Sequence, residues 1–376
     1  MFPFEKIKGL AFQDEKTKRL VKRLKRNNIA VIDHQDIDVT AAQMLIDCGV
    51  KAVVNLSNSM TGIFIHDGVE VLLNAKIPVF DVMEDLLDIN VDGKFLLIKE
   101  NCLFVDSNGI WEELCTLKLY NSLDVKYLKE KANLLFPEQF KAFVGNSLYY
   151  GEKELEVFVQ EVKKLPILRQ LFNKEVLVVA RGANYERDLK VLKPILKRKK
   201  LTTIAVDGGA DGLLKNGKKP DYIIGDMDSV SEKALKSGAV LIVHTYCDGR
   251  APGEARVRSL QIPYEKLTFI GTSEDIAIIF AYCSGANKIY TLGTRVGMNE
   301  FLEKGRIGMG SSLLTRMKVG HALVDLKGIH TLLETKEDKT LNRVMVLPAF
   351  LSLVLLSISQ RFELFLSLVF QWWSGR

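Results

Sequence analysis

Residues 207–229, DGGADGLLKNGKKPDYIIGDMDS, place glycines and aspartates directly after apolar runs, and this order decides the fold. The stretch follows the run TTIAV at 202–206 and contains a second run, YIIG, at 222–225. Short apolar runs separated by helical segments predict buried parallel strands joined by helices. The sequence therefore predicts an α/β sheet whose strands end in acidic side chains.

The same alternation continues on both sides of this stretch. From Glu175 it gives six apolar runs between helical patterns: EVLVVA, TTIAV, DYIIG, AVLIV, LTFIG and KIYTL. This pattern predicts a doubly wound α/β domain over residues 171–335. Ligands of such sheets lie outside the carboxyl ends of the strands, so we expect the functional site there.

The chain before this domain is predicted to form a domain of its own, residues 1–170. The runs NIAVID, KAVVNLS and IPVFDV alternate with helical patterns over residues 28–81 and predict a Rossmann-like α/β subdomain. Residues 94–106 predict a hairpin of two short strands, and residues 122–173 predict a helical connector. A polar cluster follows the first run, and helix caps account for most of it: Asp33, His34, Asp36 and Asp38.

The last segment, residues 336–376, is far more apolar than the rest. It contains VMVLPAFLSLVLLSIS at 344–359 and LFLSLVFQWW at 364–373. We predict a C-terminal membrane helix that anchors the chain, as a tilted span, a re-entrant hairpin or an interfacial segment. Burial in an oligomer is the alternative. Lys336, Lys339 and Arg343 precede the run, which predicts localisation at the cell membrane with the bulk of the chain on the cytoplasmic side.

The bulk composition argues against several classes of protein. The net charge of +6 is mild and the basic runs at 22–28 and 196–200 carry no aromatic residues, so we expect no nucleic-acid partner. The 5 cysteines form no C-x-x-C pair, which argues against a disulfide framework and a structural zinc site. The N-terminal residues lack the apolar core of a secretory signal.

The aspartates of the opening stretch are the first candidates for a site. Asp207 directly follows a predicted strand, and Gly208 and Gly209 open the next helix, where backbone amides can approach an anion. Asp226 and Asp228 follow the next strand with one residue between them. If the segment is still extended there, both carboxylates face the same side.

A fourth acid follows a third strand. Asp275 ends the segment GTSED at 271–275, where Thr272 and Ser273 can cap the helix or bond a phosphate. Each of these residues alone is typical of a helix cap. Together, four acids from three strand ends repel one another unless a cation lies between them. Mg²⁺ suits such oxygen ligands and is usually held by carboxylates plus substrate phosphates, so we predict a metal and a phosphorylated ligand.

The motif D-G-G-A-D followed by G-x-x-P-D-x-I-I-G-D-x-D-S resembles the catalytic domain of thiamine pyrophosphokinases. These enzymes transfer a pyrophosphoryl group from ATP to thiamine with Mg²⁺. The resemblance implies that Asp226, Asp228 and Asp275 hold the metal and the nucleotide. It also implies that Asp207 and its two glycines line the same cleft, and that Mg²⁺ and ATP or another nucleotide are the ligands.

One departure and a second resemblance narrow this interpretation. GTRVGMNEFLEKGRIGMGSS at 293–312 stands where the family usually carries G-G-R-x-D-H, so thiamine is not expected as the substrate. RGANYERDL at 181–189, HTYCDGRAPG at 244–253, FLEKGRIGMGSS at 301–312 and IAVIDHQDID at 29–38 resemble the SteA-type proteins. These are membrane-tethered relatives associated with the bacterial cytokinetic ring, which implies a cell-division membrane protein as a partner.

Three functional hypotheses follow. Arg181 and Gly182, after the run EVLVVA, add candidate contacts to phosphate. The leading hypothesis is a membrane-anchored cytoplasmic protein that binds a nucleotide with Mg²⁺ at the division machinery. The alternative is an active enzyme that transfers pyrophosphate or phosphate from ATP to an acceptor other than thiamine, with its catalytic residues unknown. The third is a scaffold with a vestigial carboxylate cluster, and a homo-oligomer is compatible with each.

Overall fold

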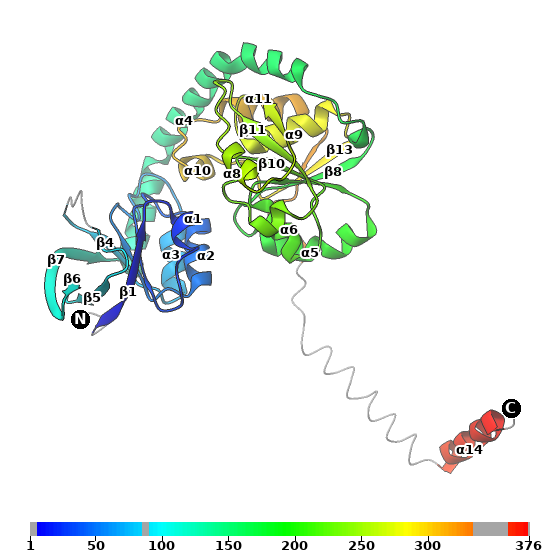
Figure 1. The fold of residues 1–376 in the computed structure, drawn as a ribbon, viewed down its shortest axis with the longest axis horizontal. Coiled ribbons are helices and arrows are strands. Elements are labelled where there is room, and N and C mark those ends of the chain that lie inside the picture. The colour runs from blue at the N-terminus through cyan, green and yellow to red at the C-terminus, as the bar shows by residue number, and fades with distance from the viewer. Residues whose placement is uncertain (1–5, 85–89, 334–359, 375–376) are drawn as a thin grey trace. The chain divides into compact units, whose positions relative to one another are not determined.

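The computed structural model describes residues 6–84, 90–333 and 360–374 (Figure 1). It divides into two compact units, Met1–Gly328 and Ile329–Arg376. The first unit contains two β-sheets, and the long helix α4 (Ser122–Lys164) lies between them in the sequence.

The first sheet has seven strands and closes into a barrel in the order β1-β2-β3-β4-β7-β6-β5. Its parallel strands are β1 (Ile7–Asp14), β2 (Ile29–Ile32), β3 (Ala52–Asn55) and β4 (Val79–Val82). Its antiparallel strands are β5 (Phe95–Lys99), β6 (Cys102–Ser107) and β7 (Ile110–Leu119). The strands are apolar on both faces because one face fills the interior and the other packs against helices. Those helices are α1 (Thr17–Leu20), α2 (Val39–Cys48) and α3 (Gly68–Asn74).

The prediction of a Rossmann-like subdomain for this region is wrong. Three predicted strands pair in parallel as β2, β3 and β4, and the hairpin forms as β5 and β6. However, a Rossmann-like sheet is open, whereas here β1 pairs with β2 on one side and with β5 on the other. The closing strand β1 was not predicted, because only two of its eight residues, Ile7 and Ala11, are buried.

Helix α4 has 43 residues, which corresponds to a length of about 64 Å. Asn121 caps its first turn: the Asn121 side chain accepts from the Leu123 and Asp124 amides, and the Asp124 carboxylate accepts from the Asn121 amide. The helix packs against α3 and against α11 (Gly310–Val319). The helix therefore contacts one helix from each sheet region. Its buried residues include Phe143, Ser147 and Phe158.

The second sheet has seven parallel strands in the order β12-β11-β10-β9-β8-β13-β14. The strands are β8 (Glu175–Val179), β9 (Thr202–Val206), β10 (Tyr222–Gly225), β11 (Val240–Thr245), β12 (Tyr264–Thr268), β13 (Lys288–Leu292) and β14 (Leu323–Asp325). All six predicted strands are present, and β14 joins them at the edge. Helices α5 (Tyr185–Arg198) and α6 (Gly209–Lys215) cover one face, and α9 (Ser273–Cys283) and α11 cover the other (Figure 1). The shorter helices are η1 (Arg169–Leu171), α7 (Glu232–Leu235), α8 (Glu254–Ser259) and α10 (Met298–Leu302).

The second unit contributes α12 (Ile329–Leu333) and α14 (Gln360–Ser374). Among the described residues, no helix has the length and apolar composition that crossing a bilayer requires. Helix α14 has only 15 residues, whereas a transmembrane helix needs about 20. The predictions of a C-terminal membrane helix and of a membrane-anchored localisation are therefore wrong. The apolar run 344–359, on which they mainly depended, lies outside the described residues.

Candidate functional site

The carboxylates of Asp207 and Asp226 meet at the carboxyl ends of two neighbouring strands. Asp207 follows β9 and Asp226 follows β10, and the two strands pair in parallel with Ile224 opposite Val206. Burial, the negative charge of Asp226 and a hydrogen bond with it raise the pKa of Asp207 well above its ordinary value. The Met227 amide, which donates to Asp207 Oδ1 at 3.3 Å, and the charge of Lys18 oppose this shift. The pair therefore needs a proton or a cation between its oxygens.

Gly225 makes room for the Asp207 carboxylate. A Cβ on Gly225 would lie 1.8 Å from Asp207 Oδ1, and the glycine has a φ of +149°, which a residue with a side chain rarely adopts. Asp207 itself has a φ of 46°. Backbone conformations that are costly elsewhere thus bring the two acids together, which is common at functional sites.

Asp228 extends the same loop into solvent. It is exposed, and its amide donates to Asp226 Oδ1 at 3.1 Å. Arg256, on α8, holds this loop by donating to three carbonyl oxygens: Met227, Asp228 at 3.0 Å and Val230 at 2.6 Å. The sequence analysis missed Arg256, because an arginine in a short charged helix resembles any solvated side chain.

Arg181 lies beside this loop, after β8. Its Nη2 donates to the Ser229 carbonyl oxygen at 3.2 Å and lies 3.8 Å from Asp211 Oδ2. Its Nε is buried and has no hydrogen-bond partner within the described parts of the chain. A Cβ on Gly208 would lie 2.2 Å from Arg181 Nη2, so this glycine lets the guanidinium reach the loop. The Gly208 amide donates to Ser229 Oγ at 3.2 Å.

Gly209 and Gly182 permit close packing of the backbone. A Cβ on Gly209 would lie 2.1 Å from the Val179 carbonyl oxygen, and one on Gly182 would lie 2.3 Å from that of Gly293. Gly293 follows β13, and the strand order reverses between β8 and β13, where parallel sheets of this kind usually have their ligand crevice. In this structure the loops after β8 and β13 are in contact at the reversal point. The acids follow β9 and β10, which lie one and two strands away from β8.

Asp275 stands apart from the other acids. Its Oδ2 accepts from the Thr272 amide at 3.0 Å, Thr272 Oγ1 at 2.9 Å, Ser311 Oγ at 3.2 Å and Ser312 Oγ at 2.8 Å. Thr272 and Asp275 form the capping box of α9. The structure thus brings the carboxylates of Asp207 and Asp226 together, leaves Asp228 exposed on the same loop and turns Asp275 toward α11. Across residues 6–84, 90–333 and 360–374, no three His, Cys, Asp or Glu side chains are placed to hold a metal ion.

The carboxylates of Asp207 and Asp226 suit a metal ion that is also coordinated by a ligand. Mg²⁺ is commonly held by one or two carboxylates, with waters and substrate phosphates completing its coordination. Asp207 and Asp226 supply such a pair, and burial together with their mutual repulsion raises the pKa of Asp207. The site is therefore suited to a magnesium ion that arrives with a phosphorylated ligand.

The charges of Asp226 and Asp275 both act on His244. Its Nε2 lies 3.1 Å from the Phe269 carbonyl oxygen, which fixes the proton on Nε2 and leaves Nδ1 to accept from Ser273 Oγ at 3.5 Å. Burial lowers the pKa of His244, against the opposing charges of Asp226 and Asp275. The imidazole is therefore neutral at neutral pH, and Ser273 lies beside it.

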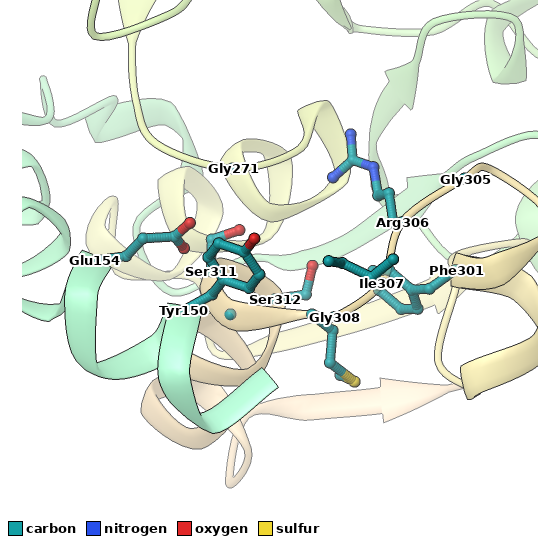
Figure 2. A pocket seen from close by; sticks show the side chains of 12 residues that line it. Tyr150, Glu154, Gly271, Phe301, Gly305, Arg306, Ile307, Gly308, Ser311 and Ser312 are labelled. Atoms are coloured by element: carbon teal, nitrogen blue, oxygen red, sulfur yellow. The ribbon is translucent and has the colours of Figure 1, made fainter. Parts of the chain in front are cut away.

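A cavity of about 280 Å³ lies on the other side of Asp275 (Figure 2). Its walls are α4, the glycine-rich loop at 305–310 and the start of α11, including Ser311 and Ser312, the two serines that hold Asp275. Sequence reasoning noted this loop only as part of a family resemblance.

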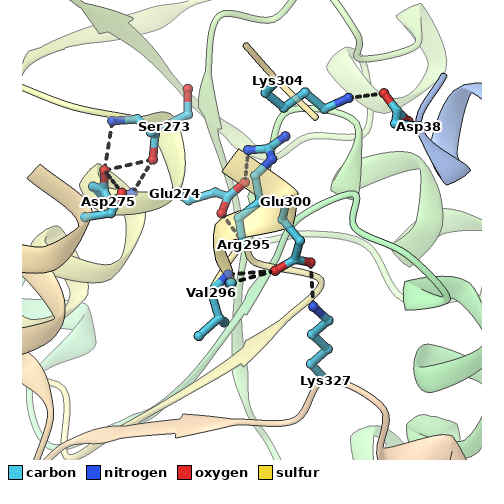
Figure 3. A network of polar contacts seen from close by, with 12 residues as sticks. Asp38, Ser273, Glu274, Asp275, Arg295, Val296, Glu300, Lys304 and Lys327 are labelled. Atoms are coloured by element: carbon cyan, nitrogen blue, oxygen red, sulfur yellow. Dashed lines mark hydrogen bonds and ion pairs between the residues drawn. The ribbon is translucent and has the colours of Figure 1, made fainter. Parts of the chain in front are cut away.

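Ion pairs fix the elements around the site (Figure 3). Arg295 Nη1 lies 2.5 Å from Glu274 Oε1, and the Arg295 amide donates to Glu274 Oε2 at 2.8 Å. Burial raises the pKa of Glu274, and the Arg295 charge opposes this. Lys304, just after α10, lies 2.5 Å from Asp38 Oδ2 of the closed-sheet region. None of these pairs was predicted, because each joins residues far apart in the sequence.

The chain is similar to known proteins over parts of its length. Residues 193–248, which include Asp207, Asp226 and Asp228, match the family model described as the thiamin pyrophosphokinase catalytic domain. This match defines a thiamine-pyrophosphokinase-like segment within the second sheet.

Two solved structures were also found to be similar. Thiamine pyrophosphokinase from Bacillus subtilis has 18% identity and a TM-score of 0.26 over 40% of this chain and 60% of that chain. 3-isopropylmalate dehydratase (leuD) from Methanocaldococcus jannaschii has 14% identity and a TM-score of 0.23, over 38% of this chain and 98% of that one. At these TM-scores neither likeness supports an argument.

Curated relatives match a different protein class. The large ribosomal subunit protein bL25 of Helicobacter pylori strain G27 is 36% identical over 78 residues, and that of Helicobacter acinonychis is 35% identical over 78 residues. Each match covers 21% of this chain and 37% of the relative. The chain thus spans little more than a third of the curated relatives it matches.

Proposed function

We propose that the chain binds ATP or another nucleotide together with Mg²⁺ at the carboxyl ends of β9 and β10. The observation that carries this proposal is the pair of Asp207 and Asp226 at the ends of two neighbouring strands, where burial and the charge of Asp226 raise the pKa of Asp207 against the opposing charge of Lys18. A magnesium ion with a polyphosphate supplies the missing positive charge and fits the oxygen ligands. The thiamine-pyrophosphokinase-like match at 193–248 supports the choice of a nucleotide.

The charged residues near the strand ends have different places in this proposal. Asp207 and Asp226 hold the metal, and Arg181 and Lys18 supply positive charge for the phosphates. That the exposed Asp228 is a metal ligand stays a prediction. When bound, Mg²⁺ neutralises the carboxylates and the phosphate oxygens together. That Asp275 is a metal ligand stays a prediction, and its Oδ2 already accepts four hydrogen bonds.

Titration calorimetry on the full chain tests this proposal. Wild type is expected to bind ADP or ATP with Mg²⁺ and to lose the binding in EDTA. Asp226→Asn is expected to weaken binding by about a hundredfold, because a charged partner of the metal is worth about 3 kcal/mol. Asp47→Asn, on the exposed face of α2, is the matched control and keeps wild-type affinity. Absence of heat with wild type rejects the proposal and leaves the scaffold hypothesis.

An active diphosphotransferase is the second candidate. The cavity beside Asp275 favours it, because an enzyme needs room for an acceptor next to the phosphates. In this reaction the acceptor oxygen bonds the β-phosphorus of ATP, the α–β bridge breaks, AMP leaves and the acceptor proton passes to solvent. Release of AMP that depends on an added acceptor supports the enzyme; nucleotide binding without AMP release with any acceptor supports a binding protein.

The cellular setting that we propose is bacterial cell division. It is supported by the resemblance of RGANYERDL at 181–189 and FLEKGRIGMGSS at 301–312 to the SteA-type proteins. A fluorescently tagged chain is expected at the division septum of a bacterium that encodes it, and deletion is expected to leave daughter cells attached. A uniform distribution with normal separation contradicts this setting and leaves the nucleotide proposal untouched.

A further inference from the structure

The cavity beside Asp275 is formed by a glycine-rich loop that docks on α4. The Asn146 side chain donates to the Ile307 carbonyl oxygen at 3.1 Å, and the Met309 amide donates to Ser147 Oγ at 3.0 Å. A Cβ on Gly310 would lie 2.7 Å from Tyr150 Cβ, so only glycine allows this approach. The loop is therefore held at a fixed distance from the helix, with the cavity between them.

One end of the cavity carries a carboxylate that needs a donor. Glu154 Oε2 is buried and has no hydrogen-bond partner among the residues that the structure describes. Burial raises the pKa of Glu154, and the negative charge of Asp275 adds to this, although the Ser311 amide opposes it. The Glu154 carboxylate lines the cavity, and its negative charge together with that of Asp275 favours a cationic donor such as an ammonium group there.

The other end carries a cation that is open to solvent. Arg306 is exposed and makes no ion pair within the described part of the chain, yet its charge reaches Glu154 and His244. Figure 2 shows Glu154 and Arg306 on opposite sides of the labelled side chains, with Ser311 and Ser312 between them. A guanidinium in this position suits a phosphate group.

The size of the cavity limits the ligand. A volume of about 280 Å³ equals the liquid volume of about nine water molecules. This is just below the usual range for ligand pockets, so a small molecule fills the cavity. We therefore expect a small polar ligand. One of its ends would lie near the negative charge of Glu154 and the other near the positive charge of Arg306.

We propose that this cavity binds a small phosphorylated amine, with the ammonium group on Glu154 and the phosphate on Arg306. This site is separate from the nucleotide site, although Gly271 and Ser311 connect its wall to the loop that carries Thr272 and Asp275. The ligand would thus lie beside the proposed nucleotide site, in the position of an acceptor or an effector.

Calorimetry on the full chain tests this proposal, with O-phosphoethanolamine as the probe. Wild type is expected to bind it, and both phosphocholine, which lacks ammonium N–H donors, and ethanolamine, which lacks phosphate, are expected to bind about tenfold more weakly. Equal affinity for phosphocholine overturns the role of Glu154. No binding of O-phosphoethanolamine overturns the whole proposal.

Variants separate this site from the nucleotide site. Glu154→Gln and Arg306→Gln are each expected to weaken binding of O-phosphoethanolamine by about tenfold. Glu152→Gln, exposed on the same helix, is the matched control and binds normally. Glu154→Gln keeps the size of this half-buried side chain and removes a charge that burial disfavours, so its melting temperature should not fall, which distinguishes lost recognition from lost folding. Nucleotide binding should survive Glu154→Gln, and O-phosphoethanolamine binding should survive Asp226→Asn; loss of either ligand in the other site's variant overturns the separation.

Discussion

Both sheets place aspartates after a parallel strand, but the surroundings of these aspartates differ. After β2, Asp36 accepts from the Thr61 amide at 2.7 Å and from Thr61 Oγ1 and His66 Nε2, each at 3.1 Å. Burial opposes ionisation, but these bonds hold the pKa of Asp36 below its ordinary value. After β9, burial and the charge of Asp226 raise the pKa of Asp207. The same sequence pattern thus gives a satisfied carboxylate in one sheet and an unsatisfied one in the other.

Asp38 shows why the first group is structural. Its side chain accepts from the Ala41 amide at 2.8 Å as the cap of α2, and Lys304 Nζ lies 2.5 Å away. Burial opposes ionisation, but the Lys304 charge and the capping bond lower the pKa of Asp38. An acidic residue after a strand is therefore a helix cap where groups of the protein donate hydrogen bonds to it. It is a candidate ligand site where such donors are few.

Gly225→Ala should have the largest effect on stability, because it disturbs the Asp207 side of this comparison. The new Cβ would strike Asp207 Oδ1, and the φ of +149° is unfavourable for alanine, so we expect a loss of about 3–4 kcal/mol in unfolding free energy. Urea denaturation measures this. Gly238→Ala, at a φ of +88° with no atom within 4 Å of the added Cβ, is the control and should lose only about 1 kcal/mol. Equal losses in the two variants would show that the Asp207 carboxylate is not held against Gly225.

Asp38→Ala should destabilise the closed-sheet side by about 2–3 kcal/mol, through loss of a helix cap and of a charged partner for Lys304. Chemical denaturation monitored by circular dichroism gives the value. Asp47→Ala, exposed near the end of the same helix, should change stability by less than about 0.5 kcal/mol. A small effect of Asp38→Ala would show that Asp38 does not have the structural role assigned to it.

Asp207→Asn should have the smallest effect and the opposite sign. Because the pKa of Asp207 is raised above 3.8, its contribution to stability is complete below that pH and is lost as the pH rises through the raised value. Asparagine stays neutral, so in EDTA at neutral pH the variant should melt about 2–4 °C higher, or about 1 kcal/mol. The difference should vanish in acid. With Mg²⁺ and nucleotide the order should reverse, and a lower melting temperature in EDTA would contradict the raised pKa.

Local patterns in the sequence predicted the central strands and the acids that follow them. TTIAV and YIIG form β9 and β10, and Asp207 and Asp226 meet because parallel neighbours end at the same edge. Closure of the first sheet could not be predicted, since it depends on pairing Ile7 with Ile98 across a long stretch of chain. Arg256 was missed for a similar reason: its value comes from three carbonyl groups that only the folded loop brings within reach.

The glycines around the site differ in whether a second mutation can compensate for their replacement. A Cβ on Gly225 would strike the Asp207 side chain, and one on Gly208 would strike that of Arg181. A second mutation that shortens the neighbour can therefore relieve the clash in either case, although the backbone strain of an alanine at 225 would remain. A Cβ on Gly182 or Gly293 would instead strike carbonyl oxygens of the main chain, 2.3 Å away. Every residue type carries that oxygen, so no substitution at the contacted position can act as a suppressor. Revertants of Gly182→Ala or Gly293→Ala should accordingly restore the glycine itself.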